Sequence, residues 1–559
     1  MKLSLGIHIG HDRGACLIKD GKVIAALSQE RIDRIKHSQS LNIPFETIDA
    51  LLEYCHLTIA DISCVGLSAV AIENDDIYNT YKNKFFSYYK CEYKPFFLVH
   101  HHDAHAYSTY YSSGFDESMI FVFDGGGDFT ESMQESETIY LASHNNISCI
   151  DRRLQNLAVR HMKDPINHII PFMPKYVQNL EMSLARKYSQ ITHLLGFGFG
   201  QEGKTMGLAS YGKPIVDLSN ADYKTLGFSL TYKDIIKDLF VMQQRSGKDF
   251  QDFLYSEREN IAATVQALIE KAVISLIQNY TQRYGIKNVC LAGGLFLNCL
   301  TNHKIIEKCN LSNVFILPAS GDDGQALGSA YYAYTKMYGT NTEFEIELPY
   351  LGLSYDDTYI EKEIKEKRLK YRKYEDGELI KKIAGYIYDS KIIAFHRGRS
   401  EIGPRALCHR SILANPTNKN MKDILNYRVK HREPFRPFAP TVVDEEQYNY
   451  FDLKHSSEYM LLATTVKDEY RSDLTAITHV DNTARIQSVA KDKEPFLHAL
   501  LMEIKAKTGY PIVLNTSFNV AGEPIVESPL DALNTFLKTD IDVLVLGNFI
   551  IEKETMLEQ

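Results

Sequence analysis

The sequence has little of what a disulfide-linked or zinc-binding protein needs. Its 559 residues include nine cysteines, an odd number, and no two of them form a C-x-x-C pair. This pattern argues against a disulfide framework and against a zinc knuckle. We therefore expect the cysteines to be reduced and structural. Tryptophan is absent altogether, which nothing else in the sequence explains.

The chain also lacks an excess of positive charge and a long apolar run. Lys and Arg number 62 against 71 Asp and Glu, a net charge of -9, whereas nucleic-acid binders carry a basic face. No stretch has the roughly 20 apolar residues of a membrane span, and the N-terminus has no apolar signal core. We expect a cytoplasmic protein with neither nucleic acid nor membrane as a partner.

Two similar strand patterns occur in the first 150 residues. The first has a polar loop at residues 10–14 and an Asp20-Gly21 pair, a strong hairpin signal. The second is an apolar run at 119–123, an acidic glycine-rich loop at 124–128 and another strand-like stretch at 136–141. The recurrence predicts an internally duplicated fold that grips a phosphate chain from both sides.

A long amphipathic helix and two α/β units follow. Ile261, Val265, Leu268, Ala272 and Leu276 recur at helical spacing. Apolar runs at 289–292 and 314–317 each end in a glycine-containing polar loop before a predicted helix, and such loops face the usual ligand crevice of an α/β sheet. A charged stretch at 361–368 interrupts the apolar pattern, so we expect a domain boundary between about 345 and 375.

A dense histidine cluster is the first candidate site. His101 and His105 are four residues apart, so they share one face of a helix. A histidine pair completed by carboxylates suits a divalent ion such as iron, zinc or manganese, and we take Fe2+ as the expected ion. Asp124 and Asp322, each near a predicted strand end, are the candidate carboxylates. A solvated helix start is the alternative interpretation of the cluster.

Glycine-rich loops and arginine-rich turns could form anion sites. Gly293-Gly294 and the 198–204 loop ending in Lys204 would let backbone amides approach phosphate oxygens; ordinary tight turns are the alternative. In the C-terminal third, cations stand in turns among Gly and Pro, which favours fixed anion-binding loops over a surface ion-pair network. These cations are Arg405, Lys430, Arg432, Arg436 and Arg485.

From these residues the chain is identified as resembling the NodU/CmcH family of O-carbamoyltransferases, which modify nodulation factors and antibiotics. Seven motifs in fixed order carry the resemblance, which runs from Gly6 to about Glu552. One departure is Cys408-His409, where the family often has Gly-Asn. The motifs are Gly10-His11-Asp12, His101-x-x-x-His105, the 202–212 segment, the 292–299 segment, Gly403-Pro404-Arg405, the 430–440 segment and Asn515-Thr516-Ser517-Phe518-Asn519.

The resemblance implies an α/β fold in two domains. Residues 1–350 would form a duplicated ribonuclease-H-like (actin-like) domain that holds the metal and transfers the carbamoyl group. Residues 370–559 would form a smaller YrdC-like α/β domain that makes carbamoyl-adenylate from carbamoyl phosphate and ATP with Mg2+. The acceptor would be a hydroxyl of a small molecule, and the resemblance is compatible with a homodimer.

The resemblance also implies roles for individual residues. His101, His105, Asp124 and Asp322 would bind the metal, and Lys430 and Arg436 would be catalytic in adenylate formation. His11 would take the proton of the acceptor hydroxyl, as its pKa range allows, with Asp12 the alternative base and a loop-stabilising hydrogen bond the alternative role. The expected substrate-binding residues are Lys204, Gly293, Gly294, Asn298, Arg405, Arg432, Arg485, Asn515, Ser517 and Asn519.

Two other functions remain open from the sequence. A fused tRNA threonylcarbamoyl enzyme is disfavoured by the net charge of -9. A non-catalytic nucleotide-binding regulator on an actin-like fold would leave the C-terminal series of candidate anion-binding residues unexplained.

We expect residues 151 to about 191 to form an acceptor-facing insertion.

Overall fold

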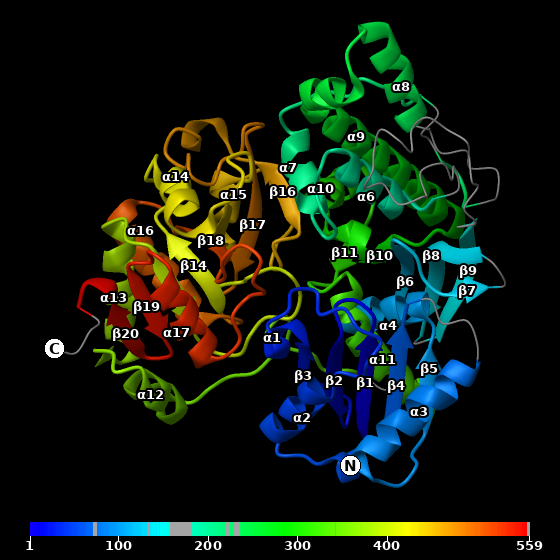
Figure 1. The fold of residues 1–559 in the computed structure, drawn as a ribbon, viewed down its shortest axis with the longest axis horizontal. Coiled ribbons are helices and arrows are strands. Elements are labelled where there is room, and N and C mark those ends of the chain that lie inside the picture. The colour runs from blue at the N-terminus through cyan, green and yellow to red at the C-terminus, as the bar shows by residue number, and fades with distance from the viewer. Residues whose placement is uncertain are drawn as a thin grey trace.

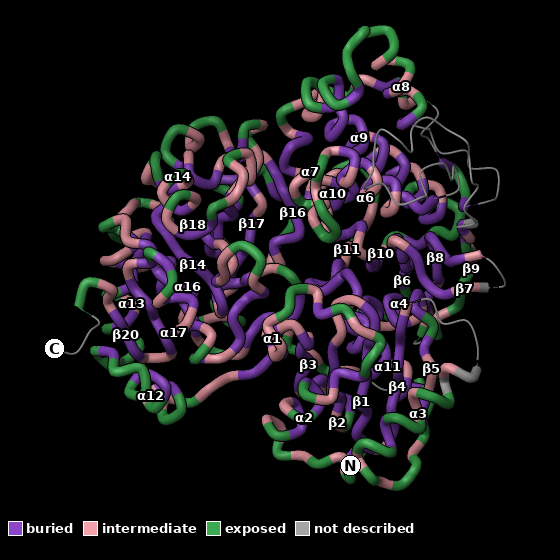
Figure 2. The backbone as a smooth tube through the Cα atoms, in the orientation of Figure 1, coloured by how far each residue is buried: buried purple, intermediate pink, exposed green. Residues whose placement is uncertain are grey.

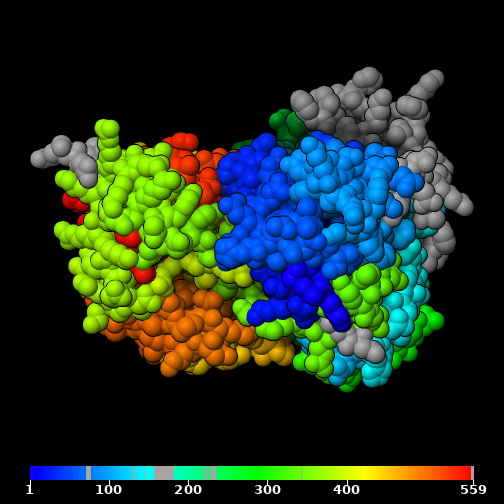
Figure 3. Space-filling model, turned by 90° about the horizontal axis from the view of Figure 1, so that it is seen from below, coloured from blue at the N-terminus to red at the C-terminus, as the bar shows by residue number. Residues whose placement is uncertain are grey.

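The structure is a computed structural model that describes residues 1–70, 75–130, 133–144, 146–156, 182–219, 223–226, 235–340 and 343–555. Strands β1 to β11 form two sheets and strands β12 to β20 form a third. In Figure 1 the third sheet lies on the left and the first two on the right. The space-filling view in Figure 3 shows the blue N-terminal residues packed against the C-terminal part.

The first sheet has the strand order β3-β2-β1-β4-β5. β1, β2 and β3 pair antiparallel, and β4 and β5 continue parallel to β1. The polar loop at 10–13 joins β1 to β2, and Asp20-Gly21 turns β2 into β3, as the sequence predicts. The strands are β1 (Leu3–Ile9), β2 (Gly14–Lys19), β3 (Lys22–Ser28), β4 (Cys64–Ala69) and β5 (Phe96–Val99).

The second sheet repeats this order as β9-β8-β6-β10-β11, and the short β7 pairs with the beginning of β8 on the same edge as β6. β6, β8 and β9 pair antiparallel, and β10 and β11 continue parallel to β6. The predicted duplication is therefore confirmed, and it is consistent with a ribonuclease-H-like fold. The strands are β6 (Glu117–Phe123), β7 (Phe129–Thr130), β8 (Met133–Ser143), β9 (Asn146–Asn156), β10 (Asn288–Ala292) and β11 (Asn313–Ile316).

Two helices, α4 and α11, pack against each other between the two sheets. They approach closely because Gly328 lies on the crossing: a Cβ atom there would stand 1.8 Å from the carbonyl oxygen of Ala104. This contact fixes α4 relative to the loop that precedes α11. The helices of the first two sheets are α1 (Glu30–Asp33), α2 (Phe45–Tyr54), α3 (Asp75–Tyr89), α4 (His101–Ser113), α6 (Leu184–Leu194), α7 (Glu202–Ala209), α8 (Ile235–Ser246), α9 (Phe250–Tyr284), α10 (Cys299–Lys308) and α11 (Gln325–Tyr338).

The predicted long helix is α9. Its predicted apolar positions, from Ile261 to Leu276, are fully buried, and it packs against α6, α7 and α10. By length and composition alone α9 could cross a membrane, but 72% of its most apolar stretch is buried inside the structure. Figure 2 shows it as a largely purple helix, so here it serves as a core helix.

The third sheet has nine strands in the order β12-β20-β19-β13-β14-β18-β15-β17-β16 and mixes parallel and antiparallel pairs. Its strands are β12 (Arg372–Lys373), β13 (Ile393–His396), β14 (Arg410–Ala414), β15 (Ala439–Val443), β16 (Leu462–Thr465), β17 (Thr483–Val489), β18 (Ile512–Ser517), β19 (Val543–Leu546) and β20 (Phe549–Glu552).

Six helices accompany the third sheet. α13 and α16 pack side by side, and α17 packs on β13 and β19. The helices are α12 (Asp357–Glu366), α13 (Asp376–Tyr388), α14 (Met421–Leu425), α15 (Gln447–Tyr450), α16 (Pro495–Thr508) and α17 (Pro529–Lys538).

Candidate functional site

The four predicted metal ligands meet between the two similar sheets. His101 and His105 lie one turn apart at the start of α4, Asp124 follows the end of β6, and Asp322 opens the short turn before α11. One ligand atom from each residue lies within 4.8 Å of the other three. The α4–α11 contact therefore brings together residues that are more than 200 positions apart.

The cluster has the donor set of a divalent metal site. His101 Nε2 lies 3.5 Å from Asp124 Oδ2 and 3.4 Å from Asp322 Oδ1, and His105 Nε2 lies 3.3 Å from Asp322 Oδ1. Within the part of the chain that the structure describes, both ring nitrogens of each histidine and both Asp322 oxygens are buried and make no hydrogen bond of good geometry, only charge contacts. Because unpaired buried polar atoms are costly, these residues fit a bound cation, which would satisfy them.

His11 extends this cluster toward the surface. Its Nε2 lies 3.0 Å from Asp322 Oδ2, and its Nδ1 lies 3.0 Å from Asp12 Oδ2. The Asp322 charge, helped by Asp12, raises the pKa of His11 well above its ordinary value despite burial. Burial would raise the pKa of Asp322, but His11 and His101 outweigh it and hold that pKa well below its ordinary value. The imidazole is thus favoured in its charged form beside an ionised carboxylate.

The sequence did not single out a third member of this chain of contacts, His37. Its Nδ1 lies 2.9 Å from Asp12 Oδ1, so Asp12 bridges the His11 and His37 rings. The backbone N–H of Asp12 also donates to the His37 carbonyl. The hydrogen bond raises the pKa of His37. His37 follows α1, 25 positions after Asp12, and no local spacing connects the two.

The predicted C-terminal signature residues also meet. Lys430 is buried, and its Nζ donates to both the carbonyl and the side-chain oxygen of Asn519, at 2.9 and 3.0 Å. It also donates to the Ser517 carbonyl at 2.5 Å. Burial, together with the charges of Arg432 and Arg436, lowers the pKa of Lys430 well below its ordinary value. A bound anion would stabilise the charged form of Lys430 against this burial and repulsion.

Four arginines continue this charge cluster: Arg432 and Arg436 act on Lys430, and Arg485 and Arg405 lie near those two. Burial lowers the pKa of Arg405, Arg432, Arg436 and Arg485, and repulsion from neighbouring arginines adds to it for Arg405, Arg432 and Arg436. The Nε atoms of Arg405 and Arg485 are buried and have no hydrogen-bond partner among the described residues. Like charges held close together with unpaired donors form a site for several anionic oxygens.

Some predicted substrate-binding residues have protein partners instead. Lys204 Nζ lies 2.6 Å from Glu433 Oε1. Asn298 caps α10 and exchanges a hydrogen bond with Gln266. Asn515 Nδ2 donates into a buried network that includes Gln487. Their roles toward a ligand stay predictions.

The predicted glycine pair lies beside the metal cluster. The N–H of Gly294 donates to Asp124 Oδ1 at 2.7 Å. Gly293 has a φ of 98°, and a Cβ atom there would stand 2.3 Å from the Phe123 carbonyl oxygen. The pair therefore holds Asp124 in place. Most of the predicted acceptor-facing insertion, residues 157–181, lies outside the described residues.

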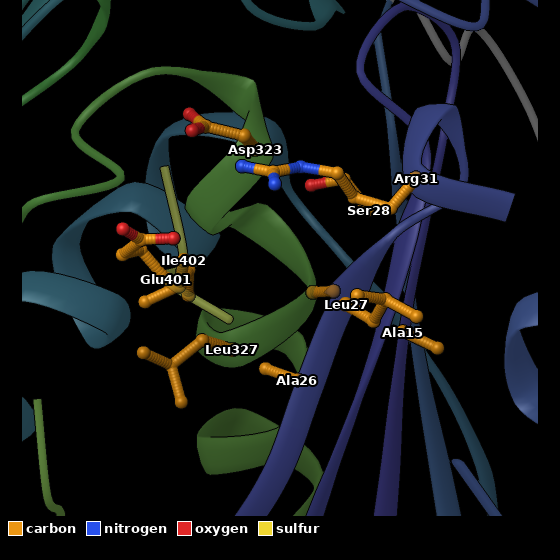
Figure 4. Close-up of a pocket in the computed structure, with 10 residues that line it drawn as sticks. Ala15, Ala26, Leu27, Ser28, Arg31, Asp323, Leu327, Glu401 and Ile402 are labelled. Atoms are coloured by element: carbon orange, nitrogen blue, oxygen red, sulfur yellow. The ribbon is translucent and has the colours of Figure 1, made fainter. Parts of the chain in front are cut away.

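The two clusters meet at the junction of the first 350 residues with the third sheet. Arg405 donates to the Leu297 carbonyl at 3.2 Å. Arg31 of α1 reaches the carbonyls of Val526 and Gly403. Arg31, Asp323 and Glu401 line a small cavity here, and Figure 4 shows Arg31 extending toward Asp323. Asp323, the sequence neighbour of Asp322, also acts electrostatically on Arg405, so the cationic cluster comes near the metal cluster at this point.

Comparisons with known proteins identify the family to which the chain belongs. Two family models match it, the carbamoyltransferase N-terminus at residues 68–331 and the carbamoyltransferase C-terminus at 384–553. Nodulation protein NolNO of Sinorhizobium fredii is 32% identical over 98% of this chain and 79% of its own length. The 3'-hydroxymethylcephem-O-carbamoyltransferase of Amycolatopsis lactamdurans is 35% identical over 46% of this chain and 47% of its own.

Among solved structures, full-length HypF in its phosphate- and nucleotide-bound form is similar over 61% of this chain and 56% of HypF, with a TM-score of 0.40 and 18% identity.

The two family models and NolNO, which matches nearly the whole chain, agree with the motifs in the sequence. They remove the alternative of a non-catalytic regulator. The chain belongs to the carbamoyltransferase family and is a transferase enzyme.

Proposed function

We propose that the protein is an ATP-dependent O-carbamoyltransferase that works in two steps. Residues 370–559, with a YrdC-like role, would form carbamoyl-adenylate from carbamoyl phosphate and ATP with Mg2+. Residues 1–350 would then pass the carbamoyl group to a hydroxyl of a small-molecule acceptor. The observation that carries the proposal is a buried cationic cluster close to a buried His/Asp cluster, with Arg405 of the first acting electrostatically on Asp323, the sequence neighbour of Asp322 in the second.

The cationic cluster suits the first step. Hydrolysis of carbamoyl phosphate gives carbamate and phosphate; the carbamate oxygen then attacks the α-phosphorus of ATP and pyrophosphate leaves. The substrates and products of these reactions all carry negatively charged oxygens, which Lys430 and the four arginines would neutralise. Ser517 and Asn519 hold the Lys430 ammonium in place through its hydrogen bonds.

The His/Asp cluster suits the second step. A divalent cation held by His101, His105, Asp124 and Asp322 would polarise the carbamoyl oxygen and neutralise the Asp322 charge that keeps His11 protonated. The neutral His11 would accept the acceptor's hydroxyl proton while Asp12 holds its Nδ1 side. The acceptor oxygen would then bond to the carbamoyl carbon as the bond from that carbon to the phosphate oxygen breaks and AMP leaves. Because carbamoyl-adenylate reacts with water, the intermediate would have to pass between the two neighbouring clusters without exposure to solvent.

The test uses the whole protein with ATP and carbamoyl phosphate and no acceptor. We expect release of pyrophosphate and an adenylate with the mass of carbamoyl-AMP. Pyrophosphate that forms without carbamoyl phosphate, or no adenylate at all, would contradict the two-step scheme. A tRNA shift in a gel assay would instead revive the threonylcarbamoyl alternative.

A further inference from the structure

An exposed aromatic ring stands beside the proposed catalytic base. Phe199 is 60% exposed, and its ring centroid lies 5.8 Å from that of His11 and 6.2 Å from that of His37. Both pairs meet nearly edge to face, at 78°. The ring therefore borders the two imidazoles that Asp12 bridges and leaves much of its surface to solvent.

The loop that carries Phe199 is shaped to present it. Gly200 has a φ of 70°, and a Cβ atom there would stand 2.8 Å from His37 Nε2, so the loop backbone packs directly on the imidazole. The side chain of Gln201 closes the turn by accepting the Gly198 N–H at 3.2 Å. Burying a phenylalanine would stabilise the fold by about 1.5–3 kcal/mol. A single exposed apolar side chain is ordinary, but Phe199 stands on a fixed loop beside the proposed base, which is where an acceptor would lie.

We propose that Phe199 is the residue on which the acceptor lies, with an apolar ring face against the aromatic ring and a hydroxyl directed at His11. This inference rests on the proposed function. Asp12, Glu30 and His37 border the same area, and their ligand atoms cluster within 4.8 Å. Asp12 and Glu30 already accept hydrogen bonds from His11 and His37, so together they form an ordered polar rim beside the aromatic ring. The acceptor it fits is a saturated ring with an apolar face and hydroxyl groups at its edge.

The absence of tryptophan gives a direct test. Phe199→Trp creates a protein with a single indole at this position, and Tyr255→Trp, at a side chain 73% exposed on α9, is the matched control. Both variants are titrated with a panel of methyl pyranosides and disaccharides and with sorbitol, an open-chain polyol. We expect a saturable emission change with ring sugars in Phe199→Trp only. No saturable change, an equal response to sorbitol, or an equal response in Tyr255→Trp would overturn the proposal.

Kinetics separate this proposal from the proposed function. With a ring sugar as acceptor, Phe199→Ala should raise KM about threefold to tenfold, the scale of one aromatic contact, and Phe199→Tyr should restore it. An unchanged KM in Phe199→Ala would overturn the role of Phe199. If the wild-type protein forms no adenylate, the proposed function fails, while the fluorescence titration still reports whether a ring sugar binds at Phe199.

Discussion

His11 Nε2 lies 3.0 Å from Asp322 Oδ2, although the two residues come from opposite halves of the duplicated fold. Asp322 therefore serves both the metal cluster and the proposed base. The same arrangement makes the two roles separable by experiment, because a change at His11 leaves the four metal ligands intact.

The first prediction concerns this histidine. His11→Asn should keep metal content and adenylate synthesis but lose carbamoyl transfer by about 100-fold or more, the usual scale for a general base. Asparagine can still donate to Asp12 but cannot accept the hydroxyl proton. Transfer rates with an acceptor, together with elemental analysis, check it; a near-normal rate would assign the base role to Asp12 or to the substrate.

The second prediction concerns the metal. His101→Ala and His105→Ala should each lose the bound ion and carbamoyl transfer, yet still release pyrophosphate at the other site. His100→Ala is the matched control, because its side chain is 70% exposed and pairs with Asp128 outside the cluster. Full metal occupancy in both variants would show that the pair is not the ligand set.

The third prediction concerns adenylate formation. Lys430→Ala and Arg436→Ala should each slow it about 100-fold to 1,000-fold, since each removes a cation from a site of developing negative charge. Lys362→Ala, at a side chain 67% exposed on α12, should change nothing. Pyrophosphate release measures the rate, and circular dichroism verifies the fold. Near-normal adenylate yield in both variants would remove these residues from the site.

The fourth prediction concerns the Lys204–Glu433 ion pair, which joins α7 to the arginine-rich loop. Lys204→Glu and Glu433→Lys should each slow adenylate formation, and the double exchange should recover part of it, with a coupling of about 1 kcal/mol. If Lys204 binds a phosphate directly, the double exchange recovers nothing. A double-mutant cycle on pyrophosphate release distinguishes the two.

Local signals predicted the parts of the site that lie next to a recognisable element. The spacing of His101 and His105 places them on one helix face, and Asp124 follows an apolar strand. The backbone conformation at position 408 was not predicted: Cys408 has a φ of 73°, a left-handed conformation in which glycine is the least strained residue.

Contacts between distant segments could not be predicted in this way. The bridge from Asp12 to His37 and the pairing of Lys204 with Glu433 depend on how loops pack after folding. Neither pair has a spacing that a helix or strand would impose. The proposed role of Phe199 could not be predicted from the sequence either, because only the folded structure shows that its ring borders His11.

Two arginines, Arg31 in α1 and Arg34 directly after it, hydrogen-bond to backbone carbonyls of the C-terminal part of the chain. Arg34 donates to the carbonyls of Ile525 and Pro524 at 2.7 and 3.0 Å, and Arg31 reaches that of Val526. Every residue offers the same carbonyl oxygen, so these hydrogen bonds do not depend on side-chain identity, although Arg34 Nε also lies 3.5 Å from Asp531 Oδ1. The segment can therefore change its sequence without releasing its neighbour, and a hybrid that joins the N-terminal part of one relative to the C-terminal part of another should still dock.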